Sequence, residues 1–317
     1  MNYKFSIDGQ VDESGKELWN YQNRKNGNGS NLSIKEIIRL VNEEDYQIIS
    51  CSTDGMTSRF KTWASALRMD SKCKVFWWPK QLISANFVDL FKDDDLITVL
   101  PPNDINFILY GEPLLLPLPT DNIDDNFTDE KLFRNKTKLG YNVESKRRLD
   151  WEYFRIPNEI REEYVNVFSL IKSKIRNDIL EEAENFSKRF NDKTISVHVR
   201  SGTGHPVEGI AEEQNRAFKS DETIKIMESY SEDHTFFVSS DEYYEQDYNQ
   251  FFLDRLKDTF GDRIFHHRGN STSLRTALID LLLLSKNKII IGTHFSSFTE
   301  VAWFFSGGKS EIILPGW

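Results

Sequence analysis

Apolar and polar residues alternate through residues 194–200, and this alternation predicts a β-strand. One face of the strand carries three apolar residues and the other carries three polar ones, respectively Ile195, Val197 and Val199, and Ser196, His198 and Arg200. A His and an Arg near the carboxyl end of a strand in a parallel sheet are out of place unless they meet a ligand, because ligands of open α/β sheets lie outside that end. The alternative is an edge strand with one solvated face.

Strands and helices are expected to alternate through the rest of the second half. The expected strands after the first are 235–239, 263–266, 288–291 and 311–314, and the expected helices are 221–230, 242–260, 274–285 and 297–305. Alternation at this spacing is typical of a doubly wound parallel sheet, so the second half is predicted to be a Rossmann-like domain.

The first half shows a shorter version of the same pattern. Its expected elements are a helix at 33–41, a strand at 46–51, a helix around 60–67 and strands at 75–79, 97–100 and 107–110. A loop-rich run follows at 113–142, and 151–190 has helical periodicity. We therefore predict two Rossmann-like domains, 1–150 and 151–317.

Composition removes several classes of function. The chain has 317 residues, 50 acidic against 40 basic, and a formal net charge of −10. No segment is strongly basic, which argues against a nucleic-acid partner. The two cysteines, Cys51 and Cys73, form no CxxC motif, so a Cys-type zinc site is not expected. The most apolar window, 277–291, is interrupted by Asp280 and by 285–288, so no membrane span is expected. We expect a cytoplasmic location.

Two side chains in the second half suggest nucleotide chemistry. Arg200 can hold a phosphate through paired N–H donors, or it can pair with a nearby carboxylate. Asp280 lies in an apolar helix, where a carboxylate is costly unless donors satisfy it. Guanine offers two donors, N1–H and N2–H, along one edge; the alternative is a bond from Arg275 or from a backbone amide.

Two strand ends add polar groups. Ser296 or Ser297 can cap the helix predicted to follow the strand 288–291, which makes an anion site or a plain N-cap. The stretch 239–241 ends another strand, and its serines and Asp241 either reach a nucleoside or cap the next helix. In the first half, Gly55 allows a tight turn or a close ligand approach. Trp77 and Trp78 end a strand, where they suit either a sugar ring or core packing.

Together these residues resemble the fucosyltransferase-like superfamily, which contains α-1,6-fucosyltransferases, the nodulation fucosyltransferase and protein O-fucosyltransferases. The resemblance lies in the His198-x-Arg200 element, the helix 273–285, the Phe295-Ser296-Ser297 loop, the strand end 238–241 and, weakly, the loop 54–59. It implies a GT-B fold, with two Rossmann-like domains facing a cleft. It also implies an inverting transfer without a metal, in which a GDP-sugar, usually GDP-fucose, is the co-substrate and a glycan or glycolipid is the acceptor.

The resemblance also implies roles for single residues. Arg200 would hold the β-phosphate with Ser296 and Ser297, and His198, Asp241 and Asp280 would lie around the nucleoside, with Asp280 reading guanine. Glu208 matches the position of a catalytic carboxylate and is the expected general base, with His205 in reserve. The residues expected on the acceptor side are Gly55, Arg59, Trp77 and Trp78.

The chain also departs from the family pattern. The α-1,6 enzymes continue His-x-Arg with Arg-x-Asp-Lys, whereas this chain has Ser201, Thr203 and Gly204 at those three positions, so the second Arg and the Lys are absent. Two alternatives therefore stay open beside GDP-fucose transfer. One is a transferase for another GDP-sugar, such as a GDP-heptose. The other is a GDP-sugar- or glycan-binding protein without catalysis. A metal-dependent GT-A transferase is a more distant alternative.

Overall fold

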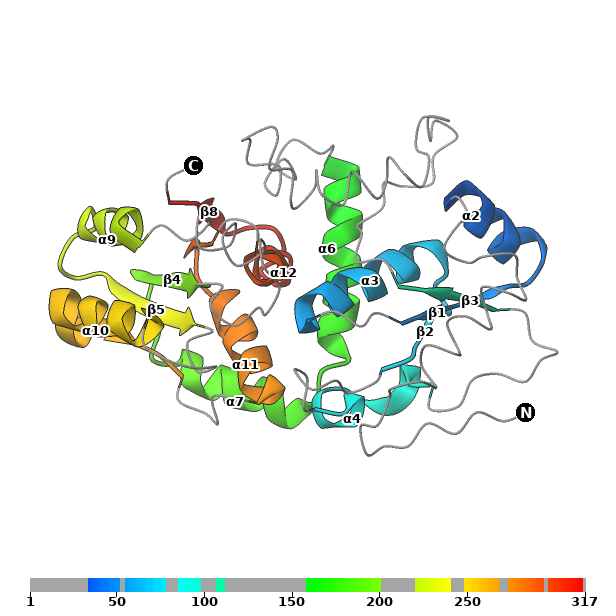
Figure 1. The fold of residues 1–317 in the computed structure, drawn as a ribbon, viewed down its shortest axis with the longest axis horizontal. Coiled ribbons are helices and arrows are strands. Elements are labelled where there is room, and N and C mark those ends of the chain that lie inside the picture. The colour runs from blue at the N-terminus through cyan, green and yellow to red at the C-terminus, as the bar shows by residue number, and fades with distance from the viewer. Residues whose placement is uncertain are drawn as a thin grey trace. The chain divides into compact units, whose positions relative to one another are not determined.

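The computed structural model describes residues 34–51, 55–77, 85–97, 107–111, 158–200, 220–240, 248–267, 273–293 and 296–315 (Figure 1). The chain divides into two compact units. Among the described residues, the first unit holds 34–111 and 158–176, and the second holds 177–315. Within the parts of the chain described, no helix is long and apolar enough to cross a bilayer.

The second unit is built on a five-stranded parallel sheet. Its strands are β4 (Thr194–Val199), β5 (Thr235–Ser240), β6 (Ile264–Phe265), β7 (Ile289–Ile291) and β8 (Glu311–Ile313), in the order β6-β5-β4-β7-β8. The chain starts at the centre, adds two strands on one side, and then crosses over to add two on the other. This is the Rossmann order, and its switch point lies between β4 and β7.

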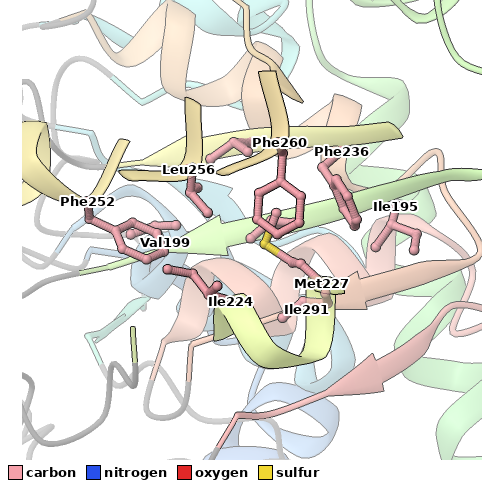
Figure 2. Close-up of a cluster of buried hydrophobic side chains, with 11 residues drawn as sticks. Ile195, Val199, Ile224, Met227, Phe236, Phe252, Leu256, Phe260 and Ile291 are labelled. Carbon is pink, nitrogen blue, oxygen red and sulfur yellow. The ribbon is translucent and has the colours of Figure 1, made fainter. Parts of the chain in front are cut away.

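Helices cover both faces of this sheet. They are α7 (Asn177–Ser187), α9 (Ser220–Glu228), α10 (Tyr248–Phe260), α11 (Leu274–Leu284) and α12 (Ser297–Phe305), with a 3-10 turn, η4 (Gly261–Arg263), before β6. Side chains of α9 and α10 pack with Ile195, Val197 and Val199 in one buried apolar cluster (Figure 2). The other face of the sheet is covered by α7, α11 and α12.

The polar face of β4 lies against this second group of helices. Ser196 donates to the Leu284 carbonyl at 2.9 Å and accepts from the Asn287 amide at 2.9 Å. All six residues of β4 are buried and β4 is the central strand, so the alternative of a solvated edge strand is wrong. The polar residues are tolerated at the centre because loop and helix groups satisfy them.

The first unit holds a three-stranded parallel sheet in the order β2-β1-β3. Its strands are β1 (Gln47–Ser50), β2 (Lys74–Val75) and β3 (Phe107–Tyr110), and its helices are α2 (Ile34–Glu43), α3 (Met56–Met69), α4 (Phe87–Leu90) and α6 (Asn158–Ser173), with a 3-10 turn, η1 (Asp93–Asp95). The α/β class with parallel sheets is thus confirmed in both units. The facing of two domains across a cleft stays a prediction.

Helix α6 packs with the first unit, although the predicted boundary at residue 151 assigns it to the second domain. Arg68 of α3 donates to the Glu163 carboxylate at 2.6 Å, and its guanidinium lies 4.2 Å from the centre of the Tyr164 ring. These contacts join residues far apart in the chain, so composition gives no sign of them. Of the expected strand 97–100, only an isolated bridge from Leu96 to Val75 is seen, and 98–100 lie outside the described residues.

Candidate functional site

The carboxyl ends of β4 and β7 are tied together at the switch point of the second sheet. The backbone amide of Arg200 donates to the Thr293 hydroxyl at 3.1 Å, and this hydroxyl donates to the His198 carbonyl at 2.8 Å. Arg200 therefore leaves β4 beside the turn that leads from β7 into α12. Ligands of open α/β sheets bind at this kind of position.

Helix α12 begins at the same place. Ser296 is its N-cap, and its hydroxyl accepts from the Phe298 amide at 3.3 Å. The first amides of a helix have no partner inside the helix, and its dipole is positive at that end, which favours an anion. The turn after β7 packs closely on the first turn of α12 only because residue 292 is a glycine, since a Cβ at this residue would lie 2.3 Å from the Thr299 Cγ2 atom.

His198 is held in place by the first turn of α12. Its Nδ1 lies 2.7 Å from the Thr299 hydroxyl, and its ring stacks on Phe298 with the ring centres 5.0 Å apart. Burial, with the charge of Arg200 as a smaller cause, lowers the pKa of His198 to about 3. The imidazole is therefore neutral at physiological pH, and it fixes the strand end against α12.

Asp280 reaches the same edge of the sheet from α11. Its Oδ2 accepts from the Ser239 hydroxyl at 3.2 Å, and Ser239 is the register partner of His198 on β5. Its Oδ1 is buried and has no hydrogen-bond partner among the residues that the structure describes. Burial raises the pKa of the Asp280 carboxyl, while His267 and Ser239 act to lower it.

The alternative bond from Arg275 to Asp280 is wrong. Arg275 instead donates to Asp178 at 2.8 Å and to Glu182 at 2.6 Å, both on α7. One turn along a helix separates residues three or four apart, whereas Arg275 and Asp280 are five apart and lie on different faces. The Ser239 hydroxyl bonds Asp280 and caps no helix among the described residues, and a contact of 239–241 with a nucleoside stays a prediction.

The structure thus brings five of the predicted residues to one edge of one sheet: His198, Arg200, Asp280, Ser296 and Ser297. Four others lie outside the described residues, namely Trp78, His205, Glu208 and Asp241. Their roles stay predictions.

The remaining candidates lie in the first unit. Gly55 is exposed at the start of α3, where a Cβ would meet no atom within 4 Å. Arg59 is buried with its guanidinium 4.5 Å from the centre of the Trp77 ring, and the Trp77 indole N–H donates to the Ala85 carbonyl at 3.1 Å. Trp77 is therefore a core residue, as the packing alternative has it. The acceptor-side role of these residues stays a prediction.

The structure also shows two groups that cannot act as nucleophiles and several partners that sequence patterns did not reveal. Burial raises the pKa of Cys51 to about 12, and that of Cys73 even further, so neither thiol forms a thiolate at neutral pH. The partners missed are Thr293 and Thr299 at the switch point and His267 and Glu182 beside Asp280. The only sequence signal for His267 was its place directly after the predicted strand 263–266.

The fold and this edge define an α/β protein with a Rossmann-ordered sheet and a candidate ligand site at its switch point. No protein-family model matches the chain, and no curated protein matches it in sequence. Among solved structures, the chain is similar to the fucosyltransferase NodZ from Bradyrhizobium, with 19% identity, coverage of 81% of this chain and 91% of that chain, and a TM-score of 0.44. It is also similar to POFUT1 in its apo form, with 11% identity, coverage of 86% and 98%, and a TM-score of 0.44. A third match is FUT1 of Arabidopsis thaliana in complex with GDP, with 15% identity, coverage of 92% and 76%, and a TM-score of 0.42.

Proposed function

We propose that this protein is a glycosyltransferase that moves a sugar from a GDP-sugar, with GDP-fucose as the favoured donor, to a hydroxyl of a glycan or glycolipid. The observation that carries the proposal is the edge of the second sheet. Arg200 leaves β4 there, at the switch point and beside the N-terminus of α12, and the buried carboxylate of Asp280, whose Oδ1 accepts no hydrogen bond from the described residues, lies at the same edge. A cytoplasmic location is part of the same proposal.

The diphosphate is assigned to Arg200 and the start of α12. Arg200 supplies paired N–H donors, and α12 supplies backbone amides and its positive dipole end around Ser296 and Ser297. When GDP leaves, negative charge develops on the β-phosphate oxygen, and fixed positive groups stabilise this charge more than the ground state. In this proposal, Arg200 and α12 supply the charge stabilisation that a metal ion supplies in other transferases.

Recognition of the guanine ring is assigned to Asp280. An ionised carboxylate only accepts, and guanine presents two donors, N1–H and N2–H, on one edge. Adenine lacks that pair of donors and uracil has a single N–H, so an ionised Asp280 selects guanine. The Asp280 Oδ1 accepts no hydrogen bond from the described residues, with His267 Nδ1 at the ion-pair distance of 3.6 Å, so it is the acceptor in need of such a donor.

The chemical step is inverting. The acceptor oxygen attacks the anomeric carbon from the face opposite the diphosphate, and the bond from that carbon to the β-phosphate oxygen breaks with its electron pair leaving on GDP. The proposed general base, Glu208, takes the proton of the acceptor hydroxyl, and His205 is the reserve candidate. His198 is not assigned this role, because its pKa is about 3 and its Nδ1 is engaged by Thr299. Gly55, Arg59 and Trp78 are proposed to lie on the acceptor side, with Trp77 as a core residue behind Arg59.

A donor screen tests the proposal. Release of the donor's own nucleotide (GDP, UDP or CMP) is measured for a panel of GDP-, UDP- and CMP-sugars, with and without acceptor glycans and with and without EDTA. We expect the enzyme to turn over GDP-sugars and none of the other nucleotide sugars, and we expect EDTA to leave the rate unchanged. Turnover of UDP-sugars, or loss of activity with the chelator, would count against the proposal.

A second candidate is a GDP-sugar- or glycan-binding protein without catalysis. It is favoured by Ser201, Thr203 and Gly204, which stand where the related pattern has a second Arg and a Lys. Tight GDP binding without turnover of any donor, including other GDP-sugars such as a GDP-heptose, would favour this candidate over transfer.

A further inference from the structure

Asp280 faces a second unsatisfied group. The Nδ1 atom of His267 lies 3.6 Å from the Asp280 Oδ1 atom, which is longer than a hydrogen bond. Both atoms are buried, and neither has a hydrogen-bond partner among the residues described. His267 lies two residues past the end of β6, so the pair lies at the carboxyl edge of the sheet beside Ser239.

Helix α7 holds the His267 ring from the other side. Its Nε2 lies 3.2 Å from Glu182 Oε1, and the ring meets Phe186 edge to face at a centre distance of 5.2 Å. Glu182 is itself fixed by Arg275, whose other nitrogen bonds Asp178. The imidazole is therefore oriented by an anchored carboxylate, with Nε2 toward Glu182 and Nδ1 toward Asp280.

The charges around the pair favour an imidazolium. The nearby carboxylate of Asp280, opposed by burial and helped by Glu182, raises the pKa of His267 above its usual range. Among the described residues, Glu182 is the ionisable group that acts on the pair directly. Arg275 acts through its bond to Glu182, and Asp178 acts through its bond to Arg275. A cation between two carboxylates offsets the cost of keeping Asp280 ionised while buried.

The protonation state of Asp280 decides which base edge it can read. An ionised carboxylate accepts at both oxygens, whereas a neutral carboxyl has one donor and one acceptor. Guanine N1–H and N2–H need two acceptors, so a neutral Asp280 would leave one guanine donor facing an O–H. Hypoxanthine keeps N1–H and lacks the amino group, so its affinity would fall less than that of guanine if Asp280 became neutral.

We propose that His267 is a positioning and specificity-determining residue, which holds Asp280 ionised and oriented so that the site prefers guanine to hypoxanthine. This inference rests on the proposed function, because it assigns Asp280 to the base of the nucleotide. Glu182 and Phe186 are its supports, since they fix the ring that faces Asp280.

Nucleotide titrations of four proteins test the inference: wild type, His267→Phe, Glu182→Gln and the control His234→Phe. Phe keeps an aromatic ring on Phe186 and removes the charge. His234 is a matched control because it lies at the opposite end of β5, with its ring near Tyr230. Affinities for GDP, IDP and ADP are measured by calorimetry over a range of pH, and folding is checked by circular dichroism.

We expect His267→Phe to lower GDP affinity at least about tenfold near neutral pH and to lower the ratio of GDP to IDP affinity by a similar factor, with a smaller loss in Glu182→Gln. The pH trends should be opposite. Wild-type affinity falls as pH rises through the raised pKa of His267, whereas the affinity of His267→Phe rises with pH as Asp280 ionises. His234→Phe should behave as wild type.

An unchanged GDP-to-IDP ratio in both His267→Phe and Glu182→Gln would overturn the inference, as would parallel pH trends. If wild type shows no preference for GDP over ADP, the proposed function itself fails, and this arm separates the two outcomes. If His267→Phe folds poorly, a measurement without ligand still tests the inference. NMR titration should give His267 a pKa above the usual value in wild type that falls in Asp280→Asn, and an ordinary value in both would also overturn the inference.

Discussion

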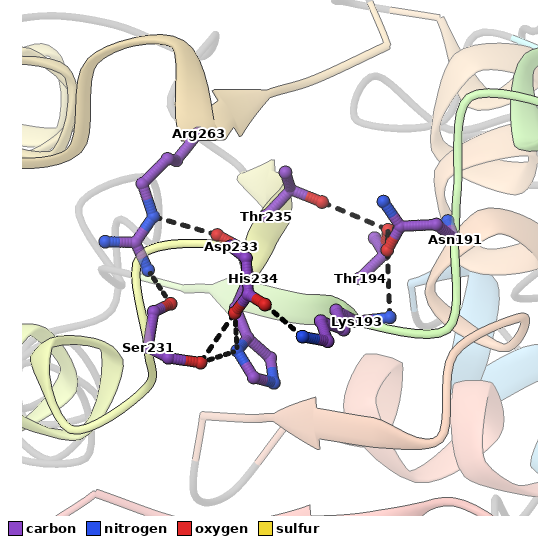
Figure 3. A network of polar contacts seen from close by, with 8 residues as sticks. All are labelled: Asn191, Lys193, Thr194, Ser231, Asp233, His234, Thr235 and Arg263. Carbon is purple, nitrogen blue, oxygen red and sulfur yellow. Dashed lines mark hydrogen bonds and ion pairs between the residues drawn. The ribbon is translucent and has the colours of Figure 1, made fainter.

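Within the part of the chain that the structure describes, polar side chains gather at both ends of strands β4 and β5, but they are hydrogen-bonded at the amino end and partly without hydrogen bonds at the carboxyl end. At the amino end, the Thr194 and Thr235 hydroxyls lie 3.1 Å apart, and Arg263 donates to the carbonyls of His234 and Ser231 at 2.8 and 2.9 Å (Figure 3). At the carboxyl end, His198 and Ser239 are hydrogen-bonded, whereas Asp280 Oδ1 and His267 Nδ1 are buried 3.6 Å apart and neither makes a hydrogen bond with the described residues.

The two aspartates show what the difference means. Hydrogen bonds from Lys193 and Ser231 lower the pKa of exposed Asp233 to about 2, whereas burial raises the pKa of Asp280. The amino end is a satisfied network that ties loops to the sheet. The carboxyl end keeps a cost that an apolar residue would avoid. Such a cost is typical of a group whose partner is a ligand.

The largest expected effect is on Arg200. Arg200→Ala should lower donor turnover by about 10²-fold or more, because it removes a cation from the developing diphosphate charge. Its melting temperature should stay near that of wild type, since Arg200 is partly exposed. The matched control is Arg263→Ala at the amino end, which should keep turnover and lose about 1–2 kcal/mol of stability. Near wild-type turnover in Arg200→Ala would remove the basis for the diphosphate assignment.

The next effect is on base selection. Asp280→Asn should lower GDP affinity about 10-fold to 100-fold, because it replaces one of the two acceptors with an N–H donor. The same change should leave stability unchanged or raise it, since it removes a buried carboxyl whose pKa folding has raised. Calorimetry and thermal melts measure the two quantities. Equal losses of GDP and UDP affinity would argue against base recognition by Asp280.

His198 should make stability depend on pH. Its pKa is about 3 in the folded state and about 6.5 unfolded, so unfolding takes up a proton between these values. The free energy of unfolding should therefore fall as pH drops below about 6.5, with a limiting slope of about 1.4 kcal/mol per pH unit from this group. Denaturant melts of wild type and His198→Gln measure it. A wild-type curve that is no steeper than that of the variant would contradict a buried neutral His198.

The smallest effect belongs to the amino end. Asp233→Asn should lower stability only slightly, because the Lys193–Asp233 pair is exposed to solvent. The folded-state pKa of Asp233 is depressed, so this contribution is present above its unfolded value and lost as pH falls through about 2. GDP binding should not change. A marked loss of GDP binding would show that the two ends are not separate in function.

Local patterns predicted the elements of the second unit well. The predicted helix 297–305 matches α12, and the strand predicted at 194–200 is β4, which ends at Val199. These predictions succeed because periodicity and caps are properties of neighbouring residues. Arg200 and Ser296 could be placed at one edge from the strand ends alone, whereas the grouping of Asp280, which lies within α11, with them rested on the family resemblance.

The partners of these residues could not be predicted in the same way. Asp280 meets His267 and Ser239 because α11 presents one face to β5 and to the segment after β6, and this rotation is set by packing. The same holds for Arg68 and Glu163, which are 95 residues apart and place α6 in the first unit. Long-range pairs of this kind leave no periodic trace in the sequence.

The most direct test of the account is a crystal structure of the protein with GDP. We predict the diphosphate against Arg200 and the amino end of α12, and the N1–H and N2–H edge of guanine at the carboxylate of Asp280. A nucleotide bound elsewhere on the protein, or bound here with its base turned away from Asp280, would contradict the account.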